Sequence, residues 1–326
     1  MFIAPLKRIA VLTSGGDAPG MNAAIRAVTR SALARGVAVT GVRRGYAGLI
    51  SAEFVDMNSR FVSNSLQRGG TILMSSRCPE MYERSGRARA AANLKAAGIG
   101  GLVTIGGNGS VRGALALWKE EKVRVVHVPS TVDNDLPGTD VTIGFDSAVN
   151  TAIGAIDKLR DTAASHGRIF LVEVMGRENG HIAVDAALAC GAEAVFIPEA
   201  KFELKALLKK VQAWWAAGKS SLIVVVAEGE EVGGVFEIAK HLKAIRGIDV
   251  RTCVLGHIQR GGAPTANDRI LASTYGAAAS DALLAGKAGV MVSLHAGRLR
   301  LVPLSVGLRK PRPSDKSRFR LVSRLA

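Results

Sequence analysis

The stretch GLVTIGGNGS, residues 101–110, places an apolar run directly before a glycine cluster. The run GLVTI is typical of a buried strand, and glycines allow a backbone turn to approach an anion closely. We expect Ser110 to cap the helix that follows, whose amino end would favour phosphate. The stretch therefore predicts a strand, an anion-binding turn and a helix in succession.

The same alternation of apolar strand and helical pattern continues along the chain. Continuous apolar strands separated by helices are typical of parallel sheets covered on both faces. We therefore predict an α/β fold with doubly wound parallel sheets. The predicted strands are RIAVLT (8–13), GVAVTGV (36–42), GLVTIG (101–106), VRVVHVP (123–129), RIFLVEV (168–174), AVFIP (194–198), SLIVVVAE (221–228), VRTCVLG (250–256) and VMVSLHA (290–296).

One helix is predicted from periodicity alone, over residues 202–219. Its apolar residues fall on one stripe that we expect to pack into the core, and Gly218 follows as a stop signal. The stripe consists of Leu204, Leu207, Leu208, Val211, Trp214 and Trp215.

Composition and length argue against several classes of protein. The 326 residues are enough for two medium domains, and no window offers the ~18 uninterrupted apolar residues of a membrane span. The opening MFIAPLKRIAVLTSGG runs straight into a strand pattern without a secretion-signal layout. Cys78, Cys190 and Cys253 are scattered and odd in number. We expect a cytoplasmic protein without a disulfide framework.

The charge is strongly positive and uneven. The formal net charge is +16, and from Arg298 onward nine Lys or Arg face one acid, Asp315. A basic tail is compatible with nucleic-acid binding, but the sequence holds no nucleic-acid motif. The favoured interpretation is a solvated basic surface on an enzyme that attracts anionic substrates, and nucleic acid remains the alternative.

Further candidate sites follow other strands, at the sheet edge where ligands bind in such folds. After the first strand, TSGGDAPGMNAAIR (13–26) brings Gly15 and Gly16, with a helix expected to begin near Pro19 or Gly20. These glycines suit an anion, and a tight turn without ligand is the alternative.

The segment PSTVDNDLPGTD (129–140) places Thr131, Asp133 and Asp135 after another strand. Two carboxylates two residues apart suit two tasks, since one accepts a proton from a hydroxyl and the other holds a metal ion or orients its partner. The alternative is an Asx-rich turn.

Basic and polar side chains flank two more strands. Arginine forks suit phosphate monoesters, and several arginines at strand ends beside glycines point to such a ligand. The residues are Met175, Gly176 and Arg177 in MGRENG, His257 and Arg260 in LGHIQRGG, and Arg168 and Arg251 near the starts of the strands that lead to them.

Taken in order, these segments resemble the bacterial ATP-dependent 6-phosphofructokinase family over about residues 7–302. The matching strings are TSGGDAPGMNAAIR (13–26), RGGT (68–71), TVDND (131–135), VEVMGR (172–177), LGHIQRGG (255–262) and DRILAS (268–273). The resemblance implies a larger nucleotide-binding domain of residues 1–138 and 251–301 and a smaller sugar-phosphate-binding domain of 139–250 and 302–326. It also implies a homotetramer, with a dimer as the alternative, that binds fructose 6-phosphate between subunits.

The resemblance further implies glycolytic, Mg2+-dependent phosphoryl transfer from ATP to the 1-hydroxyl of fructose 6-phosphate, with Asp133 as base and Arg77 bridging the transferring group. Asp135 would hold Mg2+, and Arg168 and Arg251 would reach the sugar phosphate across the interface. The nucleotide side matches Gly16, Tyr46, Arg77, Cys78, Asn108, Gly109, Ser110 and Gly113. The sugar side matches Thr131, Asp133, Arg168, Met175, Gly176, Arg177, Glu228, Arg251, His257 and Arg260.

An effector site for ADP or phosphoenolpyruvate is partly matched. Ala217 stands where a basic residue is common, and Arg60 is displaced by one position. The matching residues are Arg26, Arg30, Arg160, Glu193 and Lys219.

Three departures and two retained residues bear on activity. Asn108 replaces an aspartate that helps to hold Mg2+, Cys78 replaces an aromatic beside the base, and Tyr82 replaces an arginine. Gly109 and Ser130 favour ATP, because pyrophosphate-dependent relatives carry aspartate and lysine there. The alternatives are a catalytically weakened regulatory paralogue and a pyrophosphate- or polyphosphate-dependent enzyme.

Overall fold

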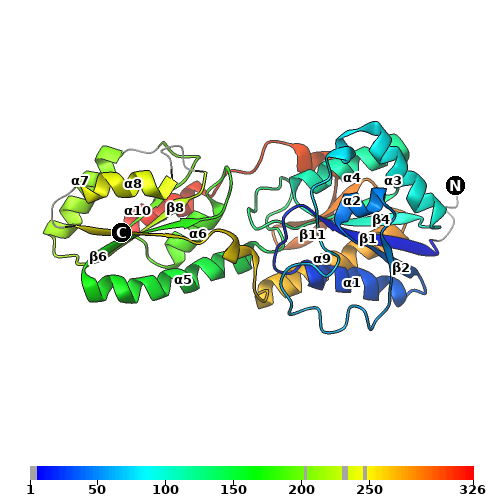
Figure 1. Ribbon diagram of the computed structural model, residues 1–326, viewed down its shortest axis with the longest axis horizontal. Coiled ribbons are helices and arrows are strands. Elements are labelled where there is room, and N and C mark those ends of the chain that lie inside the picture. Colours follow the sequence, from blue (N-terminus) through cyan, green and yellow to red (C-terminus); the bar gives the residue numbers. More distant parts are fainter. Residues whose placement is uncertain (1–5, 202–203, 230–233, 245–247) are drawn as a thin grey trace. The chain divides into compact units, whose positions relative to one another are not determined.

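The chain folds into two compact units (Figure 1). The structure is a computed structural model that describes residues 6–201, 204–229, 234–244 and 248–326. The first unit comprises Met1–Thr131, Leu136–Asp146 and Arg260–Pro311, and the second comprises Val132–Asp135, Ser147–Gln259 and Arg312–Ala326. The chain passes between the units at other points than the expected 138, 250 and 301, and the acidic segment Val132–Asp135 groups with the second unit.

The first unit is built on a seven-stranded sheet in the order β11-β10-β5-β4-β1-β2-β3. All neighbouring pairs are parallel except the two at the edges, β10–β11 and β2–β3. The strands are β1 (Arg8–Ser14), β2 (Ala38–Val42), β3 (Phe54–Met57), β4 (Gly101–Gly106), β5 (Val125–Pro129), β10 (Val290–His295) and β11 (Arg298–Pro303).

Helices cover this sheet in two layers (Figure 1). One layer holds α1 and α9, which pack on each other, and the other holds α2, α3 and α4. The helices and 3-10 turns are α1 (Met21–Leu33), α2 (Gly45–Ile50), η1 (Pro79–Tyr82), α3 (Arg84–Ala96), α4 (Asn108–Glu121), α9 (Ala266–Leu284) and η3 (Leu304–Leu308). Leu12, Leu49, Leu102 and Leu117 lie fully buried between the sheet and the second layer. The sheet is thereby apolar on both faces, which explains its continuous apolar strands.

The second unit has a four-stranded parallel sheet in the order β7-β8-β6-β9. Helices α7 and α8 pack on one core cluster with β6 and β8, while α10 packs against α6. Its elements are α5 (Phe145–His166), which starts in the first unit, β6 (Arg168–Val174), α6 (His181–Ala189), β7 (Ala194–Phe196), α7 (Leu204–Ala216), β8 (Leu222–Ala227), α8 (Gly234–Lys243), β9 (Asp249–Val254), η2 (Gly256–Arg260) and α10 (Lys316–Leu325).

The α/β class and every predicted strand are confirmed. The sequence did not predict β3 and β11, which are the two antiparallel edge strands. Neither has the apolar signature of a central strand, since β11 reads RLRLVP and is exposed at most positions.

The predicted helix at 202–219 is α7, although residues 202 and 203 lie outside the described part of the chain. Leu207 and Val211 are buried, as the apolar stripe predicts. Gly218 has φ of 85°, and the Lys219 amide donates to the Trp214 carbonyl at 3.0 Å. This bond and the one from Gly218 to Trp215 form a Schellman motif, so Gly218 ends the helix as expected.

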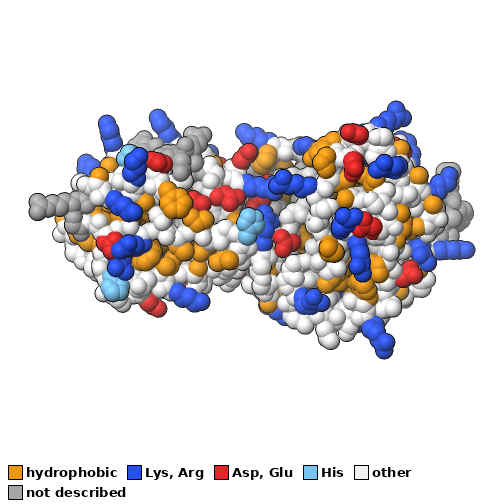
Figure 2. All heavy atoms as spheres, viewed as in Figure 1, with side chains coloured by type: hydrophobic (Ala, Val, Ile, Leu, Met, Phe, Trp, Pro, Cys, Tyr) orange, Lys and Arg blue, Asp and Glu red, His pale blue; other side chains and the backbone are white. Residues whose placement is uncertain are grey.

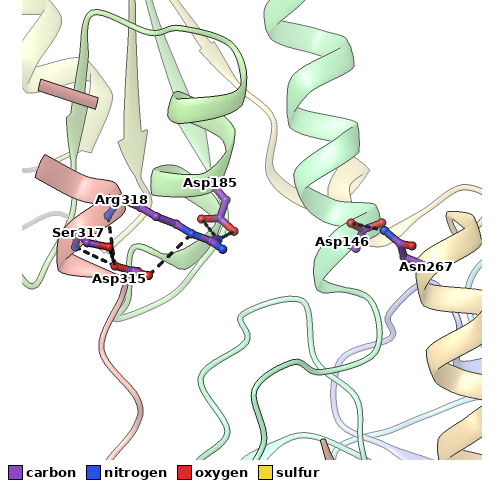
Figure 3. A network of polar contacts seen from close by, with 6 residues as sticks. All are labelled: Asp146, Asp185, Asn267, Asp315, Ser317 and Arg318. Atoms are coloured by element: carbon purple, nitrogen blue, oxygen red, sulfur yellow. Dashed lines mark hydrogen bonds and ion pairs between the residues drawn. The ribbon is translucent and has the colours of Figure 1, made fainter. Parts of the chain in front are cut away.

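The last part of the basic tail, Lys316–Leu325, folds as helix α10 within the second unit, whereas residues 298–311 belong to the first unit. Asp315 caps α10 by accepting bonds from the amides of Ser317 and Arg318 at 2.8 and 3.2 Å, and the Arg318 guanidinium pairs with both oxygens of Asp185 on α6 (Figure 3). Val322 is 2% exposed, so its burial and the ion pair between Arg318 and Asp185 both help to hold the helix in place.

On the face drawn in Figure 2, Lys and Arg side chains are scattered among acidic and apolar ones. In the described residues, no helix combines the length and the apolar character needed to cross a membrane.

Candidate active site

The glycine turns after β1 and β4 lie side by side in the first unit. Ser14 and Gly106, the last residues of these two strands, are paired in the parallel ladder. In the sheet, β2 and β3 follow on the β1 side of this pair, and β5, β10 and β11 follow on the β4 side. Such a reversal of strand order is where doubly wound folds bind ligands.

Ser110 ties these two turns together. Its hydroxyl donates to the Ser14 carbonyl at 2.8 Å, and a Cβ on Gly106 would lie only 2.3 Å from the Ser110 Oγ. The expectation that Ser110 caps α4 is wrong, because the helix begins at Asn108 and its N-cap is Gly107, without a side-chain cap. Ser110 lies within the first turn, where its hydroxyl bonds to the neighbouring strand end instead.

The amino end of α4 borders open space at Gly109. Asn108 is half-buried, and a Cβ on Gly109 would meet no atom within 4 Å. Backbone amides and the dipole at this helix end favour an anion. The arrangement suits a phosphate group beside Gly109.

Tyr46 lies behind this turn in the core. It is 4% exposed, its hydroxyl donates to the Ser110 carbonyl at 2.7 Å, and burial raises its pKa. A Cβ on Gly113 would lie 2.7 Å from the Tyr46 ring. Tyr46 and Gly113 therefore form the rear support of the turn through direct packing.

The loop that carries Arg77 is fixed to the same edge of the sheet. The fully buried Asn22 side chain donates to the Arg68 and Gly69 carbonyls at 3.0 and 3.1 Å and accepts from the Ile72 amide at 2.7 Å. Further along the loop, the Ser75 hydroxyl donates to the Gly15 carbonyl at 2.6 Å. These bonds hold a long loop with little secondary structure.

The end of this loop holds the residues predicted to face the nucleotide. Arg77 is exposed, as expected for a group that meets a ligand. Cys78 packs partly into the core, and its desolvation raises the thiol pKa. Tyr82, in η1, is 71% exposed. The ring of Tyr82, which replaces an arginine of the family, is therefore open to solvent.

The turn after β1 holds Gly16 and Arg260 close together, both in the first unit. A Cβ on Gly16 would lie 2.5 Å from the Arg260 Nη1, which donates to the Asp17 carbonyl at 3.0 Å. Helix α1 begins at Met21, with Gly20 as N-cap at φ of 106°, as predicted near this position. A side chain at position 16 would therefore displace the Arg260 guanidinium from this turn.

Thr131 directly precedes the acidic segment Val132–Asp135 and is the last residue of the first stretch of the first unit. It is 8% exposed, its carbonyl accepts from the Thr142 hydroxyl at 2.7 Å, and its Cβ would lie 3.4 Å from a Cβ on Gly107. Thr131 thus borders the turn that begins α4.

In the second unit, Asp133 and Arg177 form an ion pair. The Arg177 Nε lies 3.3 Å from the Asp133 Oδ2, and the Asp133 side chain is 1% exposed while that of Arg177 is 60% exposed. Asp135 lies beside it in sequence at 8% exposure, and its carbonyl accepts from the Arg312 amide at 3.4 Å. A buried carboxylate beside an open guanidinium suits a base that works on an anionic ligand.

The backbone of Arg177 is held in an unusual conformation. Its φ is 55°, its amide donates to the Glu228 carboxylate at 2.9 Å, and a Cβ on Gly229 would lie 1.7 Å from its carbonyl oxygen. Before it, Gly176 has φ of 151° and the Met175 amide donates to the buried Gln259 at 2.8 Å. The second unit thus brings the carboxyl ends of β6 and β8 together.

Arg168 lies at the amino end of β6 in the same sheet, and Arg251 lies in the amino-terminal half of the neighbouring strand β9. Arg168 opens β6 and Arg251 is the third residue of β9, and both guanidinium groups bond the Asp249 carboxylate, at 2.7 and 3.1 Å. These two bonds hold the pKa of Asp249 below its usual range. His257 is exposed in η2, beyond the carboxyl end of β9.

The expected effector residues fall in two groups. In the second unit, the buried Glu193 lies 3.9 Å from Arg160 and 3.6 Å from Lys219, and it accepts from the Ile223 amide at 2.7 Å. Arg26 and Arg30 lie on α1 of the first unit. The structure therefore gathers Arg160, Glu193 and Lys219 into one cluster.

Several supporting residues gave no signal in the sequence. Asn22, His127, Gly229, Asp249 and Gln259 act through a backbone or a neighbouring side chain rather than through a motif. Of these, only Asn22 and Gln259 lie inside a string matched to the family. Their contacts become visible only when the strands are assembled.

Comparison with known proteins gives a consistent result. The family model described as phosphofructokinase matches residues 8–283. The chain is 54% identical to the ATP-dependent 6-phosphofructokinase 1 of Thermus thermophilus and 48% identical to the ATP-dependent 6-phosphofructokinase of Clostridium acetobutylicum, covering 98% of this chain and 100% of each relative.

Solved structures are similar over most of the chain. Phosphofructokinase from Saccharomyces cerevisiae is 34% identical with a TM-score of 0.86, over 93% of this chain and 45% of that longer chain. The pyrophosphate-dependent phosphofructokinase of Marinobacter aquaeolei has a TM-score of 0.85 at 24% identity, over 95% of this chain and 86% of that chain, a likeness of fold alone.

Proposed function

The chain belongs to the phosphofructokinase family, and from this premise we propose that it is an ATP-dependent 6-phosphofructokinase. It would transfer the terminal phosphoryl group of ATP to the 1-hydroxyl of fructose 6-phosphate. The observation that carries the proposal is the ion pair between the buried Asp133 carboxylate and the exposed Arg177 guanidinium. Curated relatives named for this activity, at 54% and 48% identity, support it.

Asp133 is assigned as the general base. A positioned carboxylate takes the proton of the sugar hydroxyl as the hydroxyl oxygen attacks phosphorus. The guanidinium of Arg177 offsets the cost of keeping this charge out of water, and its exposed face is free to meet an anionic sugar. The Glu228 carboxylate fixes the Arg177 backbone by accepting from its amide. We assign to the sugar substrate Asp133, Arg177, Glu228, Met175, Gly176 and His257.

The glycine turns of the first unit are assigned to the nucleotide. Phosphates would lie against the amino end of α4 and the Gly15–Gly16 turn, with the exposed Arg77 neutralising charge on the transferring group. The open space at Gly109 leaves room for the α-phosphate, whereas an aspartate there would repel it. This favours ATP over pyrophosphate as donor.

The residues assigned to Mg2+ are Asp135 and Asn108. Mg2+ takes oxygen ligands and, when it is bound with nucleotide, keeps several waters and needs one or two carboxylates. The carboxylate of Asp135 and the amide oxygen of Asn108 fit that requirement, and the described residues hold no group of three acidic, His or Cys side chains that would indicate a protein-only site. When bound, the ion would neutralise phosphate charge. Asp135 keeps the full charge that Asn108 lacks.

We further infer that a second copy completes the sugar site. Arg168 begins β6, and Met175 follows its last residue; a strand of seven residues is about 20 Å long. One fructose 6-phosphate cannot contact both ends of this sheet. If Arg168 and Arg251 bind its phosphate, they belong to another subunit, which supports an oligomer and is compatible with a tetramer. The cluster of Arg160, Glu193 and Lys219 is assigned to an anionic effector.

The test measures transfer and its dependence on Asp133. The purified chain is incubated with labelled ATP, Mg2+ and fructose 6-phosphate, and the position of the new phosphate is read by NMR. We expect phosphate on the 1-hydroxyl and a loss of turnover by ~10^2 to ~10^4 in Asp133→Asn. The matched control is Asp56→Asn, because Asp56 is exposed and also pairs with an arginine. Full turnover in Asp133→Asn contradicts the assigned base.

A further inference from the structure

We propose that His127 is a positioning residue for the phosphate-binding turn of the first unit. The inference rests on the proposed function and names a residue that no motif of the family resemblance includes. His127 lies on β5 and is fully buried, one strand away from the turn that starts α4.

The hydrogen bonds of His127 define its tautomer. Its Nε2 lies 3.0 Å from the Gly106 carbonyl oxygen, and its Nδ1 lies 2.8 Å from the Thr104 hydroxyl. A carbonyl only accepts, so Nε2 carries the proton and donates it to Gly106. Nδ1 of the neutral ring then accepts from Thr104, which is also fully buried. Burial lowers the pKa of His127 to about 3, so the ring stays neutral in the working range.

The bond to Gly106 fixes more than one carbonyl. The peptide between Gly106 and Gly107 is planar and trans, so its C=O and N–H point in opposite directions. Holding the carbonyl toward His127 on β5 therefore directs the Gly107 N–H to the opposite side of β4, the side of β1 and its glycine turn. The Ser130 amide also donates to the Gly106 carbonyl, at 2.9 Å, so this oxygen accepts two hydrogen bonds.

The hydrogen bond from His127 matters for the orientation of this peptide because both of its residues are glycines. Neither side chain resists rotation of the peptide plane, and glycine explores more backbone states than other residues. The side of Gly106 is already filled, since a Cβ would lie 2.3 Å from both the Ser110 Oγ and the Ser14 carbonyl oxygen. The free movement left to Gly106–Gly107 is a rotation of the peptide, which is the movement that His127 opposes.

Two substitutions separate the two bonds of the ring. In His127→Asn, the amide oxygen replaces Nδ1 as acceptor for Thr104, but the shorter side chain does not reach Gly106. In His127→Gln, the amide nitrogen takes the place of Nε2 and restores the donor to Gly106. The control is Thr29→Val, which removes a buried bond of 2.8 Å between the Thr29 hydroxyl and the Ile25 carbonyl, inside α1.

The experiment measures KM for ATP, KM for fructose 6-phosphate, kcat and Tm in these variants. We expect His127→Asn to raise KM for ATP about fivefold, the effect of one net hydrogen bond, without changing KM for fructose 6-phosphate. His127→Gln should restore KM for ATP, and Thr29→Val should lower only Tm. A change in Tm alone in His127→Asn, or no rescue by His127→Gln, overturns the proposal.

Two readouts do not depend on turnover. The 15N spectrum of the chain labelled in histidine should place the His127 proton on Nε2, and a proton on Nδ1 overturns the proposal. If the unmodified chain transfers no phosphate, the proposed function fails, and calorimetric titration with ATP still tests His127 through the same variants. If the unmodified chain binds no ATP, both proposals fail.

Discussion

Replacing Asn108 by aspartate adds one negative charge at the first residue of α4. The structure gives two reasons why the change should be tolerated and effective. Asn108 is half-buried at a helix amino end, where a carboxylate is favoured by about 0.3–1 kcal/mol. Its neighbour Gly109 borders open space, so this end of the helix is accessible to a phosphate group and its metal ion.

The size of the effect follows from the assigned role in holding Mg2+. Two unit charges ~5 Å apart at an effective dielectric constant of ~20 interact by about 3 kcal/mol, and the divalent ion doubles this to about 6 kcal/mol. If half of that energy acts on the barrier, turnover rises about 100-fold. We therefore expect Asn108→Asp to raise kcat/KM for Mg-ATP by ~10- to ~100-fold.

The assay is steady-state transfer to fructose 6-phosphate over a titration of Mg2+, with unfolding measured in parallel. Asn58→Asp is the control, because Asn58 is exposed in the same unit and its Oδ1 already accepts from the Phe61 amide, a bond that aspartate keeps. A gain below twofold in Asn108→Asp, or an equal gain in Asn58→Asp, refutes the reasoning that Asn108 weakens the metal site.

Further predictions concern donor, acceptor, stability and pH. Gly109→Asp should raise KM for ATP at least ~10-fold by repelling the α-phosphate, with Tm unchanged because the site is open; an unchanged KM contradicts this. Arg251→Ala should raise KM for fructose 6-phosphate ~10-fold or more while KM for ATP stays constant, and an effect on ATP instead would contradict the assignment. Tyr46→Phe should cost about 1 kcal/mol, or ~2–4 °C in Tm, because the Ser110 carbonyl loses a buried donor; calorimetry checks this, and an unchanged Tm contradicts it. The pKa of His127 is about 3 in the folded chain against ~6.5 in the unfolded chain, so the stability contributed by the neutral ring is fully present above pH ~6.5. As the pH falls from ~6.5 toward 3, the free energy of unfolding should drop by ~1.4 kcal/mol per pH unit. The urea midpoint of His127→Gln should therefore fall less steeply with pH than that of the unmodified chain.

The sequence alone was enough to place every described strand except β3 and β11, together with the residues at the carboxyl ends of those strands. Continuous apolar runs carry a strong signal when both sheet faces are covered, so the central strands were predicted near their observed limits. The glycine turns after β1 and β4 were both predicted to bind an anion, and the pairing of Ser14 with Gly106 brings the two turns together, while anion binding stays a prediction. The edge strands β3 and β11 were missed because an edge strand packs on fewer neighbours and tolerates polar residues.

Side-chain contacts between neighbouring strands could not be predicted from the sequence. Ser110 was predicted to cap the helix, but its hydroxyl donates to the Ser14 carbonyl. Only the pairing of the strands brings that carbonyl near. His127 reads as one polar residue inside an apolar strand, and its role depends on Thr104 and Gly106 on the next strand. The shared partner Asp249 of Arg168 and Arg251 likewise follows from the register of β6 and β9.

The most direct test of the account compares phosphoryl donors in the unmodified chain. Fructose 6-phosphate and Mg2+ are supplied with either ATP or pyrophosphate, and formation of the 1,6-bisphosphate is followed by a coupled assay. The account predicts turnover with ATP and none with pyrophosphate. Turnover with pyrophosphate, or no turnover with ATP, would contradict it.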